Sequence, residues 1–263
     1  MEKQTLARLR TAKSAGRKFA TLTAYDASLA RLAEQAGIAC LLIGDSLGNV
    51  IQGRSSTVPV KIEEMAYHTR CVGRGTRHCF LMADMPFLSY ARPEQALANA
   101  AELMRAGAHM VKLEGGAWLA ETVRQMSERG IPLCAHLGLL PQSAIKLGGY
   151  RMQGTAPAAA QQILEDARCL EQAGADMLVL ECVPAQLAKT ITAALRIPVI
   201  GIGAGPHTDS QVLVAYDALG ISATPPKFAK NYLAHADSIQ AALALYADEV
   251  TRGTFPDTAH TLC

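Results

Sequence analysis

Short apolar runs that end in polar residues alternate with helix-like segments along this chain. The clearest run is Cys-Leu-Leu-Ile at 40–43, which continues through Gly44 into Asp45 and Ser46. An unbroken apolar run of this kind is typical of a strand buried on both faces, as in a parallel sheet covered by helices. The pattern therefore predicts an α/β protein in which polar groups gather at the ends of the strands.

The same alternation continues to the end of the chain. We expect strands at 19–26, 40–46, 80–87, 110–116, 132–138, 177–183 and 198–205. We expect helices at 28–35, 63–74, 93–107, 118–129, 158–173, 185–195 and 238–251, and an N-terminal leader helix at 3–15. Residues 212–216 would supply an eighth strand, although a helix fits them nearly as well.

Seven clear β–α steps and an eighth candidate, with no linker or change in composition, predict one (β/α)₈ TIM barrel that spans residues 1–263. A doubly wound open sheet is the alternative fold, and an organellar targeting segment is the alternative interpretation of the leader helix.

Composition narrows the class of protein. The net charge of +2 is too small to indicate nucleic acid or a membrane surface as the main partner. Seven cysteines, an odd number without a Cys-x-x-Cys pair, lie mostly in apolar runs and predict reduced thiols in a cytoplasmic protein. The N-terminus lacks the apolar core of a secretory signal, and no stretch is long and apolar enough to span a bilayer.

Carboxylates end several of the expected strands. Asp45, Asp84, Glu114 and Glu181 each follow an apolar run closely, and Asp26 adds a fifth. Because barrel strands end around one opening, these groups would repel one another unless a cation or protons intervened. One such residue alone is most simply a helix cap or an ion-pair partner.

The choice of ligand atoms indicates which metal such a set would hold. Asp45, Asp84 and Glu114 offer oxygen ligands with no Cys or His beside them, which suits Mg²⁺ rather than Zn²⁺. We therefore predict a metal site at these three residues.

Three further polar residues are candidates for the chemistry. Lys112 precedes Glu114 by two positions, so both share one face of a strand; a shift of register by one would instead point Lys112 outward. His136 ends the fifth strand and is as often structural as functional in such a place. The apolar residues 178–180 directly before Glu181 should bury its carboxyl group and so raise its pKa toward the range of a general base. The alternative is that Glu181 forms a buried ion pair with a Lys or Arg.

Two loops are candidates for binding. The irregular stretch at 139–157 is long enough for a lid or binding loop. The glycines of 201–205 follow the seventh strand, where many barrels bind phosphate, but a tight turn explains them equally well.

Long motifs, collinear over nearly the whole chain, resemble the ketopantoate (3-methyl-2-oxobutanoate) hydroxymethyltransferase family. They are 42–48 (Leu-Ile-Gly-Asp-Ser-Leu-Gly), 83–87 (Ala-Asp-Met-Pro-Phe), 111–116 (Val-Lys-Leu-Glu-Gly-Gly), 136–142 (His-Leu-Gly-Leu-Leu-Pro-Gln), 180–184 (Leu-Glu-Cys-Val-Pro) and 200–205 (Ile-Gly-Ile-Gly-Ala-Gly). Shorter matches lie at 23–26, 149–154 and 226–230.

The resemblance implies a barrel of the phosphoenolpyruvate/pyruvate superfamily that makes a precursor of pantothenate and coenzyme A. It implies transfer of a hydroxymethyl group from 5,10-methylenetetrahydrofolate to 3-methyl-2-oxobutanoate, which gives 2-dehydropantoate, with one Mg²⁺ per subunit. It further implies a cytoplasmic homo-oligomer, a decamer, that acts on small molecules only.

The resemblance also assigns roles to the candidate residues. Asp45, Asp84 and Glu114 belong to the metal site, with Glu114 acting directly or through water. Asp45 and Asp84 also contact the keto acid, and Glu181 is the base. The remaining contacts to the keto acid come from Ser46, Lys112 and His136.

Two segments depart from the family pattern. Ser210 stands where the family leads us to expect Gly, and 223–226 is shortened and lacks a Gly-His element. We expect these departures to affect local loop shape on the folate side. The alternative function is that of a C–C lyase of the isocitrate-lyase type, although the Lys-Lys-Cys-Gly-His loop that such enzymes carry is absent. A keto-acid sensor without activity is a second alternative.

Overall fold

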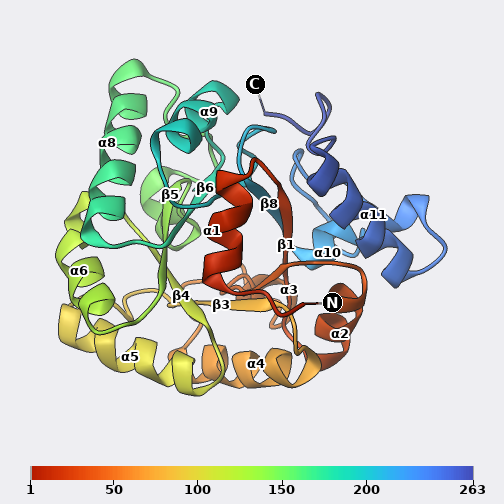
Figure 1. Cartoon of the computed structure of the whole chain (residues 1–263), viewed down its shortest axis with the longest axis horizontal. Helices are drawn as coiled ribbons and strands as arrows, with labels where there is room; N and C mark the ends of the chain where they lie inside the picture. Colours follow the sequence, from red (N-terminus) through yellow and green to blue (C-terminus); the bar gives the residue numbers. More distant parts are fainter. Residues whose placement is uncertain (1, 263) are drawn as a thin grey trace.

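Eight parallel strands close into one barrel in the computed structural model, which describes residues 2–262 (Figure 1). Each strand pairs with the next along the chain, and β1 pairs with β8. The strands are β1 (Phe19–Thr23), β2 (Cys40–Ile43), β3 (Phe80–Asp84), β4 (Met110–Glu114), β5 (Leu133–Gly138), β6 (Met177–Glu181), β7 (Val199–Ile202) and β8 (Ser210–Leu213). The predicted TIM barrel is confirmed, and the open sheet is wrong because the first and last strands are hydrogen-bonded to each other.

Helices form a ring around the barrel (Figure 1). They are α2 (Ala27–Gln35), α4 (Ile62–Gly75), α5 (Pro93–Arg105), α6 (Ala120–Glu128), α8 (Pro157–Ala173), α9 (Ala185–Ala194), α10 (Ala215–Ala218) and α11 (Ile239–Arg252). Shorter elements are α3 (Leu47–Val50), α7 (Ala144–Leu147) and the 3₁₀ turns η1 (Ala117–Leu119), η2 (Pro141–Ser143) and η3 (Leu233–His235). None of the helices described is long and apolar enough to cross a membrane.

The strands are buried on both faces, as the apolar run at 40–43 predicted. Cys40 and Leu42 point into the barrel and pack with interior side chains of other strands. Leu41 and Ile43 point outward and join the larger core between strands and helices. This alternation follows from the two-residue period of a strand and decides which residues can reach the inside of the barrel.

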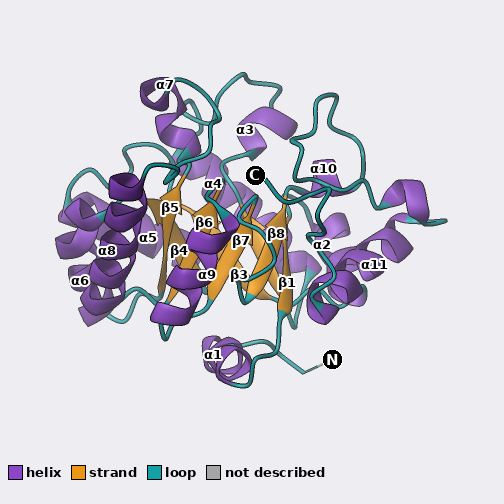
Figure 2. Ribbon diagram, turned by 90° about the horizontal axis from the view of Figure 1, so that it is seen from above, coloured by secondary structure: helices purple, strands orange, loops and turns teal. Residues whose placement is uncertain are grey.

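The leader helix covers one end of the barrel. Helix α1 (Leu6–Ser14) lies below the strands in Figure 2, at the end opposite α3 and α7. Its Leu9 is 1% exposed and packs with interior side chains that include Phe19 and Phe80. A leader helix is therefore confirmed, and it fills the end of the barrel away from the polar strand ends.

Two segments differ from their expected structure. The stretch at 212–216 is divided, because β8 starts at Ser210 and ends at Leu213, and α10 follows at once. Ser210, one of the departures from the family pattern, is fully buried, and its hydroxyl lies 2.9 Å from that of Thr21 on β1. The stretch at 139–157 is not wholly irregular, since it contains η2 and α7.

The cysteines fit the prediction of reduced thiols. The six within residues 2–262 are free, and four of them are buried. Cys263 lies outside the described residues.

Candidate active site

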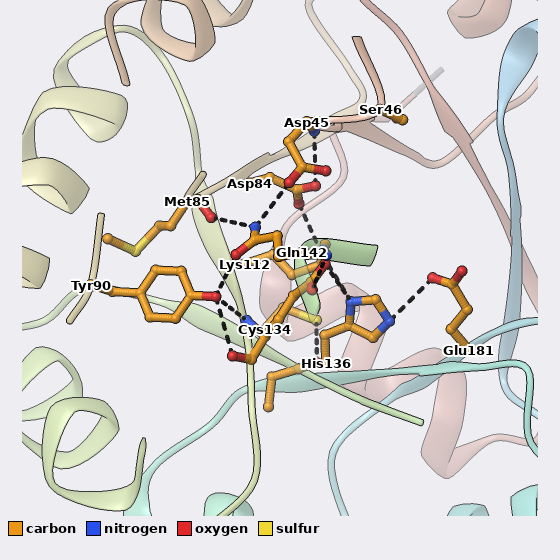
Figure 3. A network of polar contacts seen from close by, with 12 residues as sticks. Asp45, Ser46, Asp84, Met85, Tyr90, Lys112, Cys134, His136, Gln142 and Glu181 are labelled. Carbon is orange, nitrogen blue, oxygen red and sulfur yellow. Dashed lines mark hydrogen bonds and ion pairs between the residues drawn. The ribbon is translucent and has the colours of Figure 1, made fainter. Parts of the chain in front are cut away.

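A cavity of about 910 Å³ opens where the strands end. Its lining includes the seven side chains predicted for the site: Asp45, Ser46, Asp84, Lys112, Glu114, His136 and Glu181. Figure 3 shows five of them, from the ends of β2 to β6, turned toward one another: Asp45, Asp84, Lys112, His136 and Glu181.

The two-residue period of the strands explains why these side chains meet. Met82, Met110 and Cys134 point into the barrel, so the residues two positions later on the same strands also point inward. These residues are Asp84, Lys112 and His136. The register then places Asp84 beside Lys112 and Glu114 beside His136 on neighbouring strands.

Lys112 lies between two carboxylates. Its Nζ is 3.1 Å from Asp84 Oδ1 and 3.8 Å from Glu114 Oε1, and its side chain is only 4% exposed. The prediction that Lys112 faces inward is confirmed. Burial lowers the pKa of Lys112, but the charges of Asp84, Glu114 and Asp45 together raise it by more, so its ammonium stays charged.

His136 joins Glu114 to Glu181. Its Nδ1 lies 3.4 Å from Glu114 Oε1 and 3.2 Å from Lys112 Nζ, and its Nε2 lies 3.3 Å from Glu181 Oε2. Burial and Lys112 lower the pKa of His136, but the two carboxylates outweigh them and the net pKa is raised. His136 can therefore carry a proton between two acidic groups of one cavity.

Glu181 is the most accessible of the four carboxylates at the strand ends. Its side chain is 13% exposed, against 5% for Asp84 and 2% for Glu114. The apolar lead-in of β6 predicted stronger burial, but Glu181 lies at the rim, where the cavity opens. Its ion-pair partner within the described residues is His136, not the Lys or Arg of the alternative interpretation.

Asp45 and Ser46 lie just beyond the end of β2. The backbone N–H of Asp45 donates to Asp84 Oδ2 at 3.0 Å, which joins the two acidic residues. The Ser46 hydroxyl lies 2.9 Å from the Tyr25 hydroxyl. Both side chains thus enter the cavity from the same short turn.

Negative charge is concentrated in the buried half of the site. Burial raises the pKa of Asp45, and the charges of Asp84 and Glu114 raise it further. Burial also raises the pKa of Asp84, although Lys112 and the N–H of Asp45 oppose the rise. The pKa of Glu114 is lowered, because hydrogen bonding and charge from His136, with the charge of Lys112, outweigh burial. Because its pKa is raised to about 8, the Asp45 carboxyl group is protonated at neutral pH unless a cation offsets the charges of Asp84 and Glu114.

Asp45 and Asp84, here called the acidic pair, suit a hard divalent cation. Asp84 Oδ1 is buried and accepts no well-directed hydrogen bond, although Lys112 lies close to it. Within residues 2–262, no three His, Cys, Asp or Glu side chains are arranged to hold a metal ion by themselves. Mg²⁺ typically binds one or two carboxylates and completes its shell with waters and substrate, so Asp45 and Asp84 fit it.

Glu114 fits direct metal binding less well than Asp45 and Asp84. Its Oε2 accepts a hydrogen bond from the backbone N–H of Gln142 at 3.1 Å, and its Oε1 faces His136 and Lys112. Both of its oxygens thus have donors from the protein.

Asp26 does not belong to the site, contrary to its place among the five acidic strand ends. Its Oδ1 accepts hydrogen bonds from Ser28 N at 2.8 Å and Leu29 N at 3.0 Å. It is the N-cap of α2, because β1 ends at Thr23, three residues earlier. The simpler interpretation of an acidic residue after a strand holds here.

The glycines at 201–205 are explained by packing. A Cβ on Gly201 would lie 2.6 Å from Thr208 Oγ1, and one on Gly205 would lie 2.5 Å from Ala185 Cβ. Such close approach requires glycine whether or not a ligand binds.

The segment at 139–157 contributes to the cavity wall. Leu139, Pro141, Tyr150 and Met152 line the cavity, and Tyr150 remains 62% exposed. The predicted lid or binding loop therefore lies beside the acidic groups.

Two residues that contact the site were not predicted from the sequence. Gln142 donates from Nε2 to Asp45 Oδ2 at 2.9 Å, and Tyr90 donates to Gln142 Oε1 at 2.7 Å (Figure 3). Gln142 ends the motif at 136–142, which was a signal for its involvement. Tyr90 stands in a turn between β3 and α5 with no chemical pattern around it.

Comparisons with known proteins identify relatives of this chain. The sequence model of the ketopantoate hydroxymethyltransferase family matches residues 3–258. A 3-methyl-2-oxobutanoate hydroxymethyltransferase of Yersinia pestis (strain Pestoides F) is 59% identical, over 99% of both chains. The enzyme of the same name from Yersinia enterocolitica is also 59% identical over 99% of both chains.

Solved structures of more distant proteins share the fold. A putative phosphonomutase from Burkholderia cenocepacia superposes with a TM-score of 0.67 at 19% identity, over 82% of this chain and 94% of that one. A phosphonopyruvate hydrolase superposes with a TM-score of 0.64 at 16% identity, over 98% and 99%. A 2,3-dimethylmalate lyase of the PEP mutase/isocitrate lyase superfamily gives 0.59 at 16% identity, over 82% of each chain. These likenesses show that the barrel fold is shared.

Proposed function

Because this chain belongs to the ketopantoate hydroxymethyltransferase family and is a transferase, we propose that 5,10-methylenetetrahydrofolate is its one-carbon donor and Mg²⁺ its metal. The acceptor is 3-methyl-2-oxobutanoate and the product is 2-dehydropantoate. The observation that carries the proposal is that one cavity holds an oxygen-only acidic pair, a buried ammonium and the accessible carboxylate of Glu181.

The acidic pair would hold the metal. Asp45 and Asp84 supply the carboxylates, and Glu114 acts through water because its own oxygens have protein donors. When bound, Mg²⁺ polarises the keto oxygen of the substrate and makes the adjacent C3–H more acidic.

Three side chains would bind the keto acid. The Ser46 hydroxyl and the Lys112 ammonium donate to its oxygens, and the third side chain, His136, lies between Lys112 and Glu181. As C3 loses its proton, negative charge moves onto the keto oxygen, and Lys112 stabilises it in a site from which water is largely excluded.

Glu181 is the proposed general base. It removes the C3 proton, and the resulting carbanion carbon attacks the methylene carbon carried by the folate. A new C–C bond forms, both bonds from that carbon to the folate nitrogens N5 and N10 break, and water supplies the hydroxyl oxygen. The two nitrogens take up the proton removed from C3 and the second proton of the water. Tetrahydrofolate leaves as the second product.

The folate would occupy the outer part of the cavity. A volume of about 910 Å³ far exceeds what a small keto acid fills, and it lies within the range of about 300–1,000 Å³ usual for larger ligands. Apolar side chains such as Met152, Ile221 and Phe228 line this part and suit a flat ring system.

The function is tested by incubating the protein with Mg²⁺, methylenetetrahydrofolate and 3-methyl-2-oxobutanoate and measuring 2-dehydropantoate by mass. Product that depends on all three components supports the proposal. Binding of the keto acid without any product would instead indicate a sensor.

Glu181→Gln tests the base directly, because it keeps the shape of the side chain and removes the proton acceptor. We expect exchange of the C3 hydrogen for deuterium, measured without folate, to slow by about 10²–10⁴-fold. Glu165→Gln, on the exposed face of α8, is the matched control. Exchange at the wild-type rate in Glu181→Gln would remove this residue from the base role.

The lyase alternative is not favoured. The solved structures with this fold, one of which is a lyase, are 15–19% identical to this chain. Identity at this level shows a shared fold only. The relatives at 59% identity carry the hydroxymethyltransferase name.

A further inference from the structure

Gln142 and Tyr90 form a buried polar bridge beneath the acidic pair. Gln142 is 5% exposed and Tyr90 is 6% exposed. Gln142 lies in η2, just after β5, and Tyr90 lies between β3 and α5. Neither residue has a role in the reaction proposed above.

Gln142 donates hydrogen bonds to groups at the ends of three different strands. Its Nε2 donates to Asp45 Oδ2 at 2.9 Å and to the backbone oxygen of Met85 at 3.0 Å. Its backbone N–H donates to Glu114 Oε2 at 3.1 Å. One residue therefore fixes two of the three carboxylates relative to the backbone that follows β3.

Tyr90 fixes the orientation of the Gln142 amide. The Tyr90 hydroxyl accepts from Glu114 N at 3.3 Å. Its one proton faces two acceptors, Gln142 Oε1 at 2.7 Å and the Glu114 backbone oxygen at 3.2 Å, and it donates to the nearer Gln142. The opposite side of the amide faces only acceptors, Asp45 Oδ2 and Met85 O, so Nε2 must point there. A flipped amide would bring oxygen against oxygen at two contacts.

The neutrality of the Gln142 amide matters as much as its geometry. An amide orients a carboxylate without cancelling its charge, whereas an ammonium such as Lys112 both orients and neutralises. The Gln142 hydrogen bond occupies one oxygen of Asp45, leaves its other oxygen available to a cation, and adds no positive charge that would compete with that cation. Groups of this kind behind metal ligands commonly set the ligand geometry.

We propose that Gln142, oriented by Tyr90, is a positioning residue that holds Asp45 and Glu114 in the arrangement that binds the divalent cation. The inference rests on the metal site of the proposed function. Because Gln142 lies at the base of the segment 139–157, it also joins the metal site to the part of the cavity wall that carries Tyr150 and Met152.

Metal binding without substrates tests the proposal, with Mn²⁺ as a spectroscopic probe for the oxygen site and electron paramagnetic resonance as the readout. Gln142→Met keeps most of the volume and removes the hydrogen bonds of the side chain. We expect its Kd for Mn²⁺ to rise by about 10–100-fold. Tyr90→Phe removes one hydroxyl and should raise the Kd less, by up to about tenfold.

The double variant separates a positioning role from two independent effects. If Tyr90 acts through Gln142, then Gln142→Met/Tyr90→Phe binds Mn²⁺ no more weakly than Gln142→Met alone. The controls are Gln153→Ala, whose side chain donates only to Arg151 O, and Tyr67→Phe, which is 58% exposed. Both should bind Mn²⁺ as the wild type does.

Three outcomes would count against the inference. Folded Gln142→Met and Tyr90→Phe proteins with the wild-type Kd would overturn it, and so would a double variant whose effect is the product of the two single effects. A lower melting temperature with unchanged Kd would assign the bridge to stability alone. If the wild type binds neither Mn²⁺ nor Mg²⁺, the metal of the proposed function fails, and that result is distinct from these.

Discussion

Lys112 is the residue on which the charge balance of the site depends. Its buried ammonium is the closest cation to Asp84 and lies beside Glu114, so part of the role that the sequence assigned to a metal belongs to a side chain. Removing one partner of a buried ion pair leaves an uncompensated charge and commonly costs about 3–5 kcal/mol.

Lys112→Met should therefore lower the free energy of unfolding by about 3 kcal/mol, measured by urea denaturation without metal. Added Mg²⁺ should restore more stability to this variant than to the wild type, because the cation would replace the missing charge. Lys189→Met, on the exposed surface of α9, is the control and should change stability by less than about 0.5 kcal/mol. An equally small effect of Lys112→Met would contradict the charge balance described here.

Glu34 gives a pH-dependent test far from the cavity. Burial raises its pKa, but the Thr76 hydroxyl and the backbone N–H groups of Arg77 and His78 donate to it and lower its pKa to about 2. A folded-state pKa below the ordinary 4.5 means that the stabilisation is present above about pH 4.5 and is lost as pH falls toward 2.

Glu34→Gln should therefore destabilise the protein by about 1.5–3 kcal/mol at pH 7, and the difference from wild type should shrink as the pH falls below 4.5. Thermal denaturation between pH 7 and pH 3 measures both. Glu128→Gln, which removes an exposed pair with Arg124, should change little at any pH. A difference for Glu34→Gln that stays constant over this pH range would contradict the hydrogen-bonded carboxylate.

At the level of elements, β5 and β6 must approach closely for Glu181 to reach the cavity. Gly138 has a φ of +92°, and its register partner on β6 is Glu181. A Cβ at this position would lie 2.2 Å from the backbone oxygen of Glu181 and 2.7 Å from Val183 Cγ1. Contact at this distance forces the end of β6 away from β5.

Gly138→Ala should therefore lower both stability and activity, with a cost in unfolding free energy above about 2 kcal/mol from the left-handed backbone and the clash together. Gly130→Ala separates the two effects, since it has a φ of +76° and nothing within 4 Å of the added Cβ. It should cost only the backbone strain, about 1 kcal/mol, and leave activity unchanged. Deuterium exchange at C3 of the keto acid reports whether Glu181 has moved. Equal costs for the two variants would show that β5 and β6 tolerate the added methyl group.

At the scale of the whole molecule, binding of the proposed metal would be linked to folding, because the carboxylates that would hold Mg²⁺ come from strand ends far apart in sequence. Asp45 and Asp84 lie beside each other only in the closed barrel. A ligand that binds only the folded state raises the free energy of unfolding by about 2.7 kcal/mol at a hundredfold excess over its Kd.

Mg²⁺ should therefore raise the melting temperature of the wild type, and EDTA should reverse the rise. Asp84→Asn keeps the shape of the side chain but removes its charge, so its melting temperature should respond far less to Mg²⁺. Asp237→Asn, an exposed position before α11, should respond as the wild type does. The same Mg²⁺ response in wild type and Asp84→Asn would exclude Asp84 from the metal site.

Local sequence patterns predicted most of the strands and helices and, for one strand, which residues share a face. The two-residue period of β4 predicted that Lys112 and Glu114 share one side of their strand, although the outward direction stayed open as an alternative for Lys112. The apolar run at 40–43 likewise fixed a strand buried on both faces. Such features are local, because covalent geometry sets the direction of each side chain along a strand.

Contacts between distant segments of the chain set which of these residues meet and how their pKa values shift. Asp26 and Asp45 look alike in sequence, yet one caps a helix and the other joins the acidic pair, because β1 ends three residues before the first and β2 ends two residues before the second. Lys112 between two carboxylates, Glu181 at the rim and the bridge from Tyr90 through Gln142 to Asp45 all join different strand ends or loops. These contacts depend on the register that closes the barrel, which no single segment of the chain specifies.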